Sequence, residues 1–113
     1  MINYYIEENG VPKKVDVDTW AKWAATNPKR EVKRTVFEKE KVEVVTVFFG
    51  LPEINFEFDP KGKNPPKEIE YLYGTMVFGG NLNHQEEIYC HRKEAEDGHE
   101  KVVAQVRADL ASA

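Results

Sequence analysis

The chain is poor in three features that would narrow its function: cysteine, basic residues in excess, and long apolar runs. Its 113 residues include one cysteine, Cys90, which excludes an internal disulfide framework and suits a reducing compartment. No apolar run approaches the roughly 20 residues needed to span a bilayer. The first ten residues also lack the basic start and apolar run of a secretory signal. We therefore predict an intracellular protein with no membrane partner.

The net charge is −4, from 16 basic and 20 acidic residues. Proteins that neutralise nucleic-acid phosphates usually show a basic excess, so a nucleic-acid partner is not expected. A basic cluster does occur between residues 29 and 41, but Glu31, Glu38 and Glu40 are interspersed in it. Its members are Lys29, Arg30, Lys33, Arg34, Lys39 and Lys41. This mixture is typical of a solvated hairpin whose charges protect an edge strand.

Composition predicts a folded domain. Hydrophobic residues make up 41% of the chain and aromatic residues 12%, which is too much apolar surface for a disordered tail. A chain of this length can bury a core without a metal or disulfide. There is no internal repeat and no low-complexity tract, so we expect a single domain covering residues 1–113.

The first half of the chain predicts two hairpins with a helix between them. Asn9-Gly10 is a strong two-residue turn signal between alternating residues 2–6 and the returning arm 11–15, where Pro12 favours a sheet edge. A helix is expected to begin near Thr19, capped by Asp16 or Asp18. Asn27-Pro28 should end it, and its tryptophans, Trp20 and Trp23, share one face with Ala24.

The second hairpin should pair residues 31–38 with residues 42–49. The segment VEVVTVFF is apolar on both alternating faces, which predicts a central strand covered on both sides and ended by Gly50-Leu51-Pro52. Residues 54–58 predict a separate short strand, and residues 59–67 a surface loop rich in proline and lysine.

Two further strands and a helix complete the pattern. Residues 68–78 predict a long strand, in which Gly74 indicates a bulge or a close backbone approach. Gly79-Gly80-Asn81 then turns the chain into a strand over residues 86–91. The final segment predicts a helix with one apolar stripe: Ala95, His99, Val102, Val103, Val106 and Leu110. The fold class is therefore α+β, a mainly antiparallel sheet of hairpins with two helices, the last packed on the sheet.

Cys90, His91 and His99, with His84, are the residues whose types could bind a metal or perform nucleophilic catalysis. Zinc would need a deprotonated Cys90 and neutral imidazoles in a tetrahedral arrangement, but adjacent residues on a strand point to opposite faces. A Cys90 thiolate with a histidine base is a second possibility, because a helix N-terminus lowers a thiol pKa. The simplest interpretation is structural, with His99 packed on the helix stripe. No metal is expected, because Cys90 and His91 are adjacent, and no other cofactor is expected, because the glycine pair before Asn81 has no phosphate-loop spacing.

Several segments together resemble a group of small uncharacterised proteins encoded by bacteriophages and prophages. They are VDVDTWAKW, TVFFGL, YLYGTMVFGG and IYCHRKEAEDGHEKVVAQVR, spread from Val15 to Arg107. In that group a serine or threonine commonly occupies the place of Cys90 or His91, and this chain departs from it there. The resemblance implies a phage accessory protein in the host bacterial cytoplasm. It does not imply a mechanism.

We accordingly predict a non-enzymatic protein-binding module, such as a phage inhibitor of a host defence protein. The alternatives are a virion or assembly component, or a small zinc or thiol enzyme using Cys90, His91 and His99. A protein partner is expected, and a homo-oligomer is possible. The predicted contact residues are Arg34, Lys39, Lys41, Lys61, Lys63, Tyr71 and Tyr73.

Overall fold

The computed structural model describes residues 2–28 and 30–112, so the predicted cluster member Lys29 lies outside the described residues. Strands β1 and β2 form a two-stranded antiparallel sheet, and β3, β4, β5 and β6 form a four-stranded antiparallel sheet in sequential order. The elements are β1 (Tyr4–Glu8), β2 (Val11–Val15), α1 (Val17–Thr26), β3 (Glu31–Phe37), β4 (Val42–Glu57), β5 (Lys67–Phe78), β6 (Glu86–Tyr89) and α2 (Arg92–Ala111). The predicted α+β class is confirmed. Neither described helix is long and apolar enough to cross a membrane.

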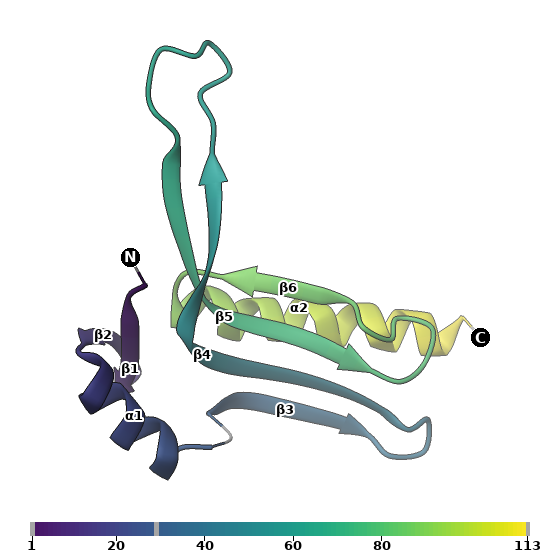
Figure 1. Ribbon diagram of the computed structural model, residues 1–113. Coiled ribbons are helices and arrows are strands. Elements are labelled where there is room, and N and C mark those ends of the chain that lie inside the picture. The colour runs from purple at the N-terminus through teal and green to yellow at the C-terminus, as the bar shows by residue number, and fades with distance from the viewer. Residues whose placement is uncertain (1, 29, 113) are drawn as a thin grey trace.

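Helix α2 lies along one face of the four-stranded sheet (Figure 1), as its apolar stripe predicts. Val102, Val103 and Val106 are buried against β4 and β5. A second cluster, toward the N-terminal end of α2, contains Phe48 and Ala95. Tyr5 of β1 and Trp23 of α1 pack against this second cluster, so the small sheet and first helix close that end of the core.

The N-terminal hairpin and α1 follow their sequence signals closely. Asn9 and Gly10 both have positive φ, as a two-residue hairpin turn requires. The Asp16 side chain accepts a hydrogen bond from the Thr19 backbone amide at 2.7 Å, so the helix begins at Val17, slightly earlier than expected. Asn27 ends the helix, as predicted.

Strand β4 differs from the prediction, because Gly50-Leu51-Pro52 does not end it. The strand continues to Glu57, with a register shift between Phe48 and Glu53 against β5. Gly50 has a φ of +78°, and a Cβ there would lie 2.8 Å from the Trp20 indole nitrogen. Glycine therefore allows a bend rather than a stop, and the β4–β5 ribbon turns away from the sheet. We call residues 51–71 the arm (Figure 1).

The prediction that β4 is covered on both sides is also wrong. In Figure 1, α2 covers one face of the sheet, and none of the described elements lies over the other. Val36 and Phe78 on that other face are each 45% exposed. Apolar residues on alternate faces show that a strand is central, but they do not show that a second layer is present.

Two glycines lie close to aromatic rings, and Gly74 also lies near the backbone of β6, where the Glu87 carbonyl oxygen would be 3.5 Å from an added Cβ. A Cβ on Gly98 would lie 2.3 Å from the ring of Tyr89, so α2 approaches β6 closely enough to exclude even alanine without movement. A Cβ on Gly74 would lie 2.4 Å from the ring of Phe49. Strand β6 ends at Tyr89, two residues before the end of the strand predicted over residues 86–91, so Cys90 and His91 lie in the connection to α2.

Candidate protein-interaction surfaces

The arm exposes aromatic side chains in the way a binding surface does. Ile54 and Phe56 alternate along β4 and so share one face of the ribbon, and Phe58 directly follows the last residue of the strand. Phe56 is 56% exposed and Phe58 is 68% exposed. A two-stranded ribbon has no second layer of its own, so these rings remain in solvent unless another surface covers them.

The base of the arm is tied to the N-terminal hairpin. Glu70 accepts a hydrogen bond from the Tyr5 hydroxyl at 3.0 Å and another from the Asn3 side-chain amide at 3.1 Å. Burial raises the pKa of Tyr5, and the hydrogen bond to Glu70 raises it further. The arm therefore leaves the body from a fixed point, and Phe56 and Phe58 lie beyond it.

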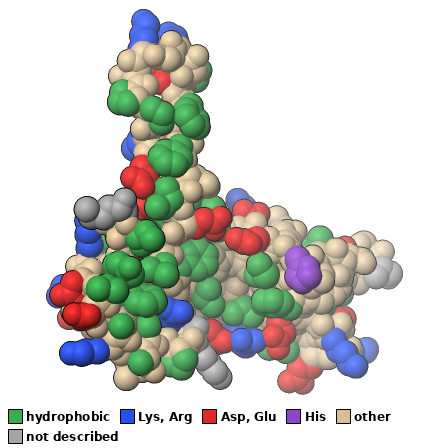
Figure 2. Space-filling model, in the orientation of Figure 1, with side chains coloured by type: hydrophobic (Ala, Val, Ile, Leu, Met, Phe, Trp, Pro, Cys, Tyr) green, Lys and Arg blue, Asp and Glu red, His purple; other side chains and the backbone are tan. Residues whose placement is uncertain are grey.

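The tip of the arm is ordered by one aspartate and presents lysines. The Asp59 carboxylate accepts hydrogen bonds from the backbone amides of Lys61, Lys63 and Asn64, at 3.0, 3.1 and 3.0 Å. The Lys61 amide is the main reason that the pKa of Asp59 lies below its ordinary value. Figure 2 shows the basic side chains at the tip, above hydrophobic side chains along the arm. Among the described residues, no ion pair involves the ammonium groups of Lys61, Lys63 or Lys67.

The uncovered side of the four-stranded sheet is a second apolar surface, which we call the open face. Strand register places Arg34, Val45, Met76 and Glu86 in one row across it. Its apolar members are Val36, Val45, Val47, Phe49, Met76 and Phe78. Several of them line a shallow apolar hollow that reaches Glu86 at the β6 edge. No ion pair or hydrogen bond to the Glu86 side chain occurs among the described residues.

The basic β3–β4 hairpin and the arm tip, both predicted to contact a partner, do not form one surface. Strand β4 runs from the turn that carries Lys39 and Lys41 toward the arm, so the two lie at opposite ends of the strand (Figure 1). Arg34 is already engaged, because it pairs with Glu31 and with Glu43, the latter at 2.6 Å. These ion pairs neutralise the charge of Arg34 at the edge of the open face.

The two predicted contact tyrosines differ from each other. Tyr71 is half-buried on the arm, opposite Glu53. Tyr73 is 0% exposed, and its hydroxyl donates to Glu7 at 2.6 Å. Burial and that hydrogen bond raise the pKa of Tyr73 well above its ordinary value. Tyr73 lies in the buried cluster that contains Ala95 of α2. The prediction that it is an exposed contact residue is therefore wrong.

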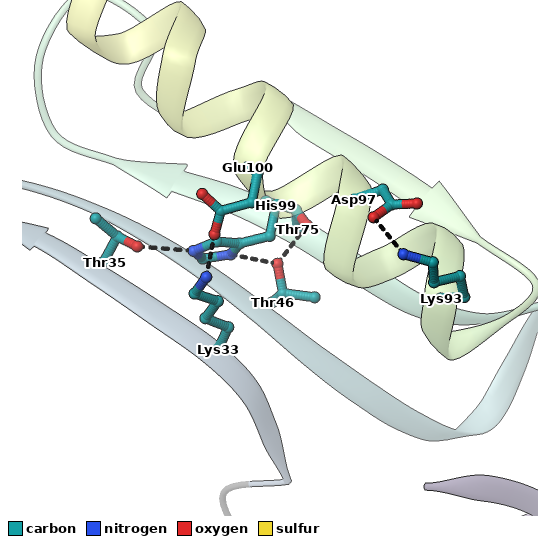
Figure 3. A network of polar contacts seen from close by, with 8 residues as sticks. All are labelled: Lys33, Thr35, Thr46, Thr75, Lys93, Asp97, His99 and Glu100. Carbon is teal, nitrogen blue, oxygen red and sulfur yellow. Dashed lines mark hydrogen bonds and ion pairs between the residues drawn. The ribbon is translucent and has the colours of Figure 1, made fainter.

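His99 lies at the centre of a buried polar network (Figure 3). Its Nε2 atom is 2.8 Å from the Thr35 hydroxyl and its Nδ1 atom is 2.7 Å from the Thr46 hydroxyl, which in turn bonds Thr75. A neutral imidazole can donate from one nitrogen and accept at the other, so both ring positions are satisfied. Burial lowers the pKa of His99, which favours this neutral form.

Cys90 and His91 do not join that network. His91 is the exposed N-cap residue of α2, and its side chain makes no capping hydrogen bond. Burial, with a contribution from Glu94, raises the pKa of the Cys90 thiol, opposite to what a thiolate nucleophile needs. Within residues 2–28 and 30–112, no group of three or more His, Cys, Asp or Glu side chains converges on a metal position.

Sequence reasoning missed the phenylalanines of the arm. The alternation of Ile54, Phe56 and Phe58 predicts a strand with one buried face, because strands with this pattern are usually half-buried. In the structure, the bend at Gly50 carries these residues away from the sheet, so none of the described elements lies under their side chains. Leu51-Pro52 after a glycine was a weak signal for that bend.

Comparison with protein-family models, with curated proteins and with solved structures found no match to this chain.

Proposed function

We propose that this chain is a non-enzymatic protein-binding module that uses the arm as its principal contact element. The observation that carries this proposal is the pair of exposed rings, Phe56 and Phe58, held away from the body on a tethered ribbon. Exposed aromatic side chains on a defined backbone are efficient anchors, because they bury much area with little loss of side-chain freedom.

In the finer form of the proposal, the protein is a phage accessory factor of the bacterial cytoplasm that inhibits a host defence protein. This form rests on the resemblance of four segments, among them YLYGTMVFGG, to phage-encoded proteins. The lysines at the arm tip suit a target whose apolar slot is rimmed by carboxylates.

Two observations argue against the zinc or thiol enzyme. Both ring nitrogens of His99 bond threonine hydroxyls, which leaves no free imidazole lone pair directed at Cys90. The raised pKa of Cys90 keeps the thiol protonated at neutral pH.

Affinity capture from a bacterial lysate tests the proposal. The Phe56→Ser/Phe58→Ser double variant should lose a protein that the wild type retains, because both anchors are gone. Val17→Ser is the matched control, since Val17 is 50% exposed on α1, away from the arm. Capture of no bacterial protein, or of one that both variants retain equally, contradicts a bacterial target for the arm.

A further inference from the structure

Two apolar surfaces of this chain, the arm and the open face, complement each other in shape and charge. The arm offers exposed phenylalanines beside a basic tip. The open face offers an apolar hollow whose β6 edge carries Glu86, a carboxylate without an ion pair among the described residues. Lysines of the tip therefore match the charge beside the hollow that would receive the rings.

The arm cannot reach the open face of its own chain. It departs from the sheet at the bend after Phe49 and is held at its base by the bonds from Asn3 and Tyr5 to Glu70 (Figure 1). Folding back would break this tether and reverse the bend. The two surfaces can meet only between two molecules.

Dimensions allow such a meeting. From Leu51 to Phe58 an extended strand covers about 23 Å, and four paired strands are about 14 Å wide between the outer backbones. One arm is thus long enough to lie across a whole sheet. Figure 2 shows hydrophobic side chains both along the arm and on the body beside its base.

We propose that two copies of this chain form a two-fold dimer in which the arm of each lies across the open face of the other. This inference rests on the proposal that the arm binds protein, and it names a second copy as its partner. A reciprocal contact occurs twice per dimer and closes on itself, so it produces a defined pair and not an open chain of molecules.

Sedimentation equilibrium of the purified protein, up to about 1 mM, tests this arrangement. The wild type should sediment at twice the 13.0 kDa chain mass. Phe56→Ser/Phe58→Ser on the arm and Phe78→Ser on the open face should each weaken the dimer by about tenfold or more, while Val17→Ser leaves it unchanged. High salt should weaken the wild-type dimer, because lysines of the arm tip face Glu86 across the contact.

Mixing the two variants separates this arrangement from other dimers. A molecule with an intact arm and one with an intact open face can still form one complete contact, so the mixture should associate more tightly than either variant alone. A dimer weakened by only the arm variant or only the face variant, or a mixture no tighter than its components, overturns the proposal. Unchanged circular dichroism of each variant ensures that lost association does not reflect lost folding.

The same measurements separate this inference from the proposed function. A monomeric wild type that still captures a bacterial protein through Phe56 and Phe58 overturns the dimer and leaves the binding module intact. A dimer with the predicted variant pattern and no captured protein supports the second copy as the partner and removes the host target. A monomer with no arm-dependent capture overturns both.

Discussion

The two halves of β4 both carry phenylalanine side chains, but one half is buried and the other is exposed. Residues 42–49 lie under α2 and include Phe48, which is 1% exposed, whereas residues 50–57 form one side of the arm and include Phe56, which is 56% exposed. Both halves pair with β5, with a register shift between Phe48 and Glu53. The difference arises from the bend at Gly50, which carries the second half beyond the reach of any other layer. Backbone pairing is enough to form a strand, but its side chains are buried only where a second layer covers the strand.

The largest expected effect comes from truncating the same residue type in each half. Phe48→Ala should lower the free energy of unfolding by about 3–5 kcal/mol, because the ring packs edge-on against Trp23 and contacts Tyr73 in the core. Phe56→Ala should change it by less than about 0.5 kcal/mol in the monomer, where the ring is 56% exposed. Urea unfolding of both variants, at a protein concentration low enough to keep the chain monomeric, measures this difference. Comparable losses at the two positions would mean that the arm is buried within the monomer.

A second test concerns the close contact between α2 and β6. Gly98→Ala should destabilise the protein by about 1–3 kcal/mol through overpacking against Tyr89, although alanine has the better helix propensity. Adding Tyr89→Ala removes the obstructing ring. The second substitution should therefore cost less in the Gly98→Ala background than in the wild type, and urea unfolding of the four proteins gives this coupling. Stabilisation by Gly98→Ala alone would show that the helix lies farther from β6.

His99 makes the stability of the helix-covered face depend on pH between 5.5 and 7.5. Because burial lowers its pKa from the ordinary 6.5, the folded state holds the neutral ring and the unfolded state binds the proton more readily. Its contribution is therefore complete above pH 6.5 and declines as the pH falls from 6.5 through the lower folded pKa. Urea unfolding between pH 7.5 and 5.5 should show this loss.

The matched variant for that experiment is His99→Gln, which cannot titrate but keeps polar atoms near Thr35 and Thr46. It should be less stable than the wild type at pH 7.5 by about 1–3 kcal/mol, because the paired hydroxyls lose their geometry. The gap should narrow at pH 5.5. Lys33 and Glu100 form an ion pair beside His99 in both proteins, so their contribution largely cancels. An equal pH slope in the two proteins would contradict a titrating buried ring.

Local patterns predicted the helix-covered face well. The apolar stripe of α2 identified all five of its buried residues, and Asn9-Gly10, Asp16 and Asn27 marked turn and helix ends. These features depend on residues that are only a few positions apart, so their spacing in the sequence is enough to predict the local geometry.

The arm and the open face were not predictable in the same way. Whether Gly50 stops a strand or bends it depends on the Trp20 side chain and Arg30, which lie beside it only in the folded chain. The exposure of Phe56 and the burial of Tyr73 follow from that bend, because both residues have the alternating pattern of half-buried strands. The candidate surfaces thus depend on long-range placement, whereas the core depends on periodicity.

The smallest expected effect tests whether the arm tip is locally ordered. Asp59→Ala removes the carboxylate that holds the backbone amides of Lys61, Lys63 and Asn64, so the loop at residues 58–66 should open more often. Limited trypsin digestion should cut after Lys61 and Lys63 faster than in the wild type, while global unfolding in urea stays unchanged. Glu57→Ala is the control, because it removes a neighbouring carboxylate to which no loop amide donates among the described residues. Equal cleavage rates in the two variants would mean that the lysines of the tip are not held in place by Asp59, and the tip would then lose more conformational freedom on binding.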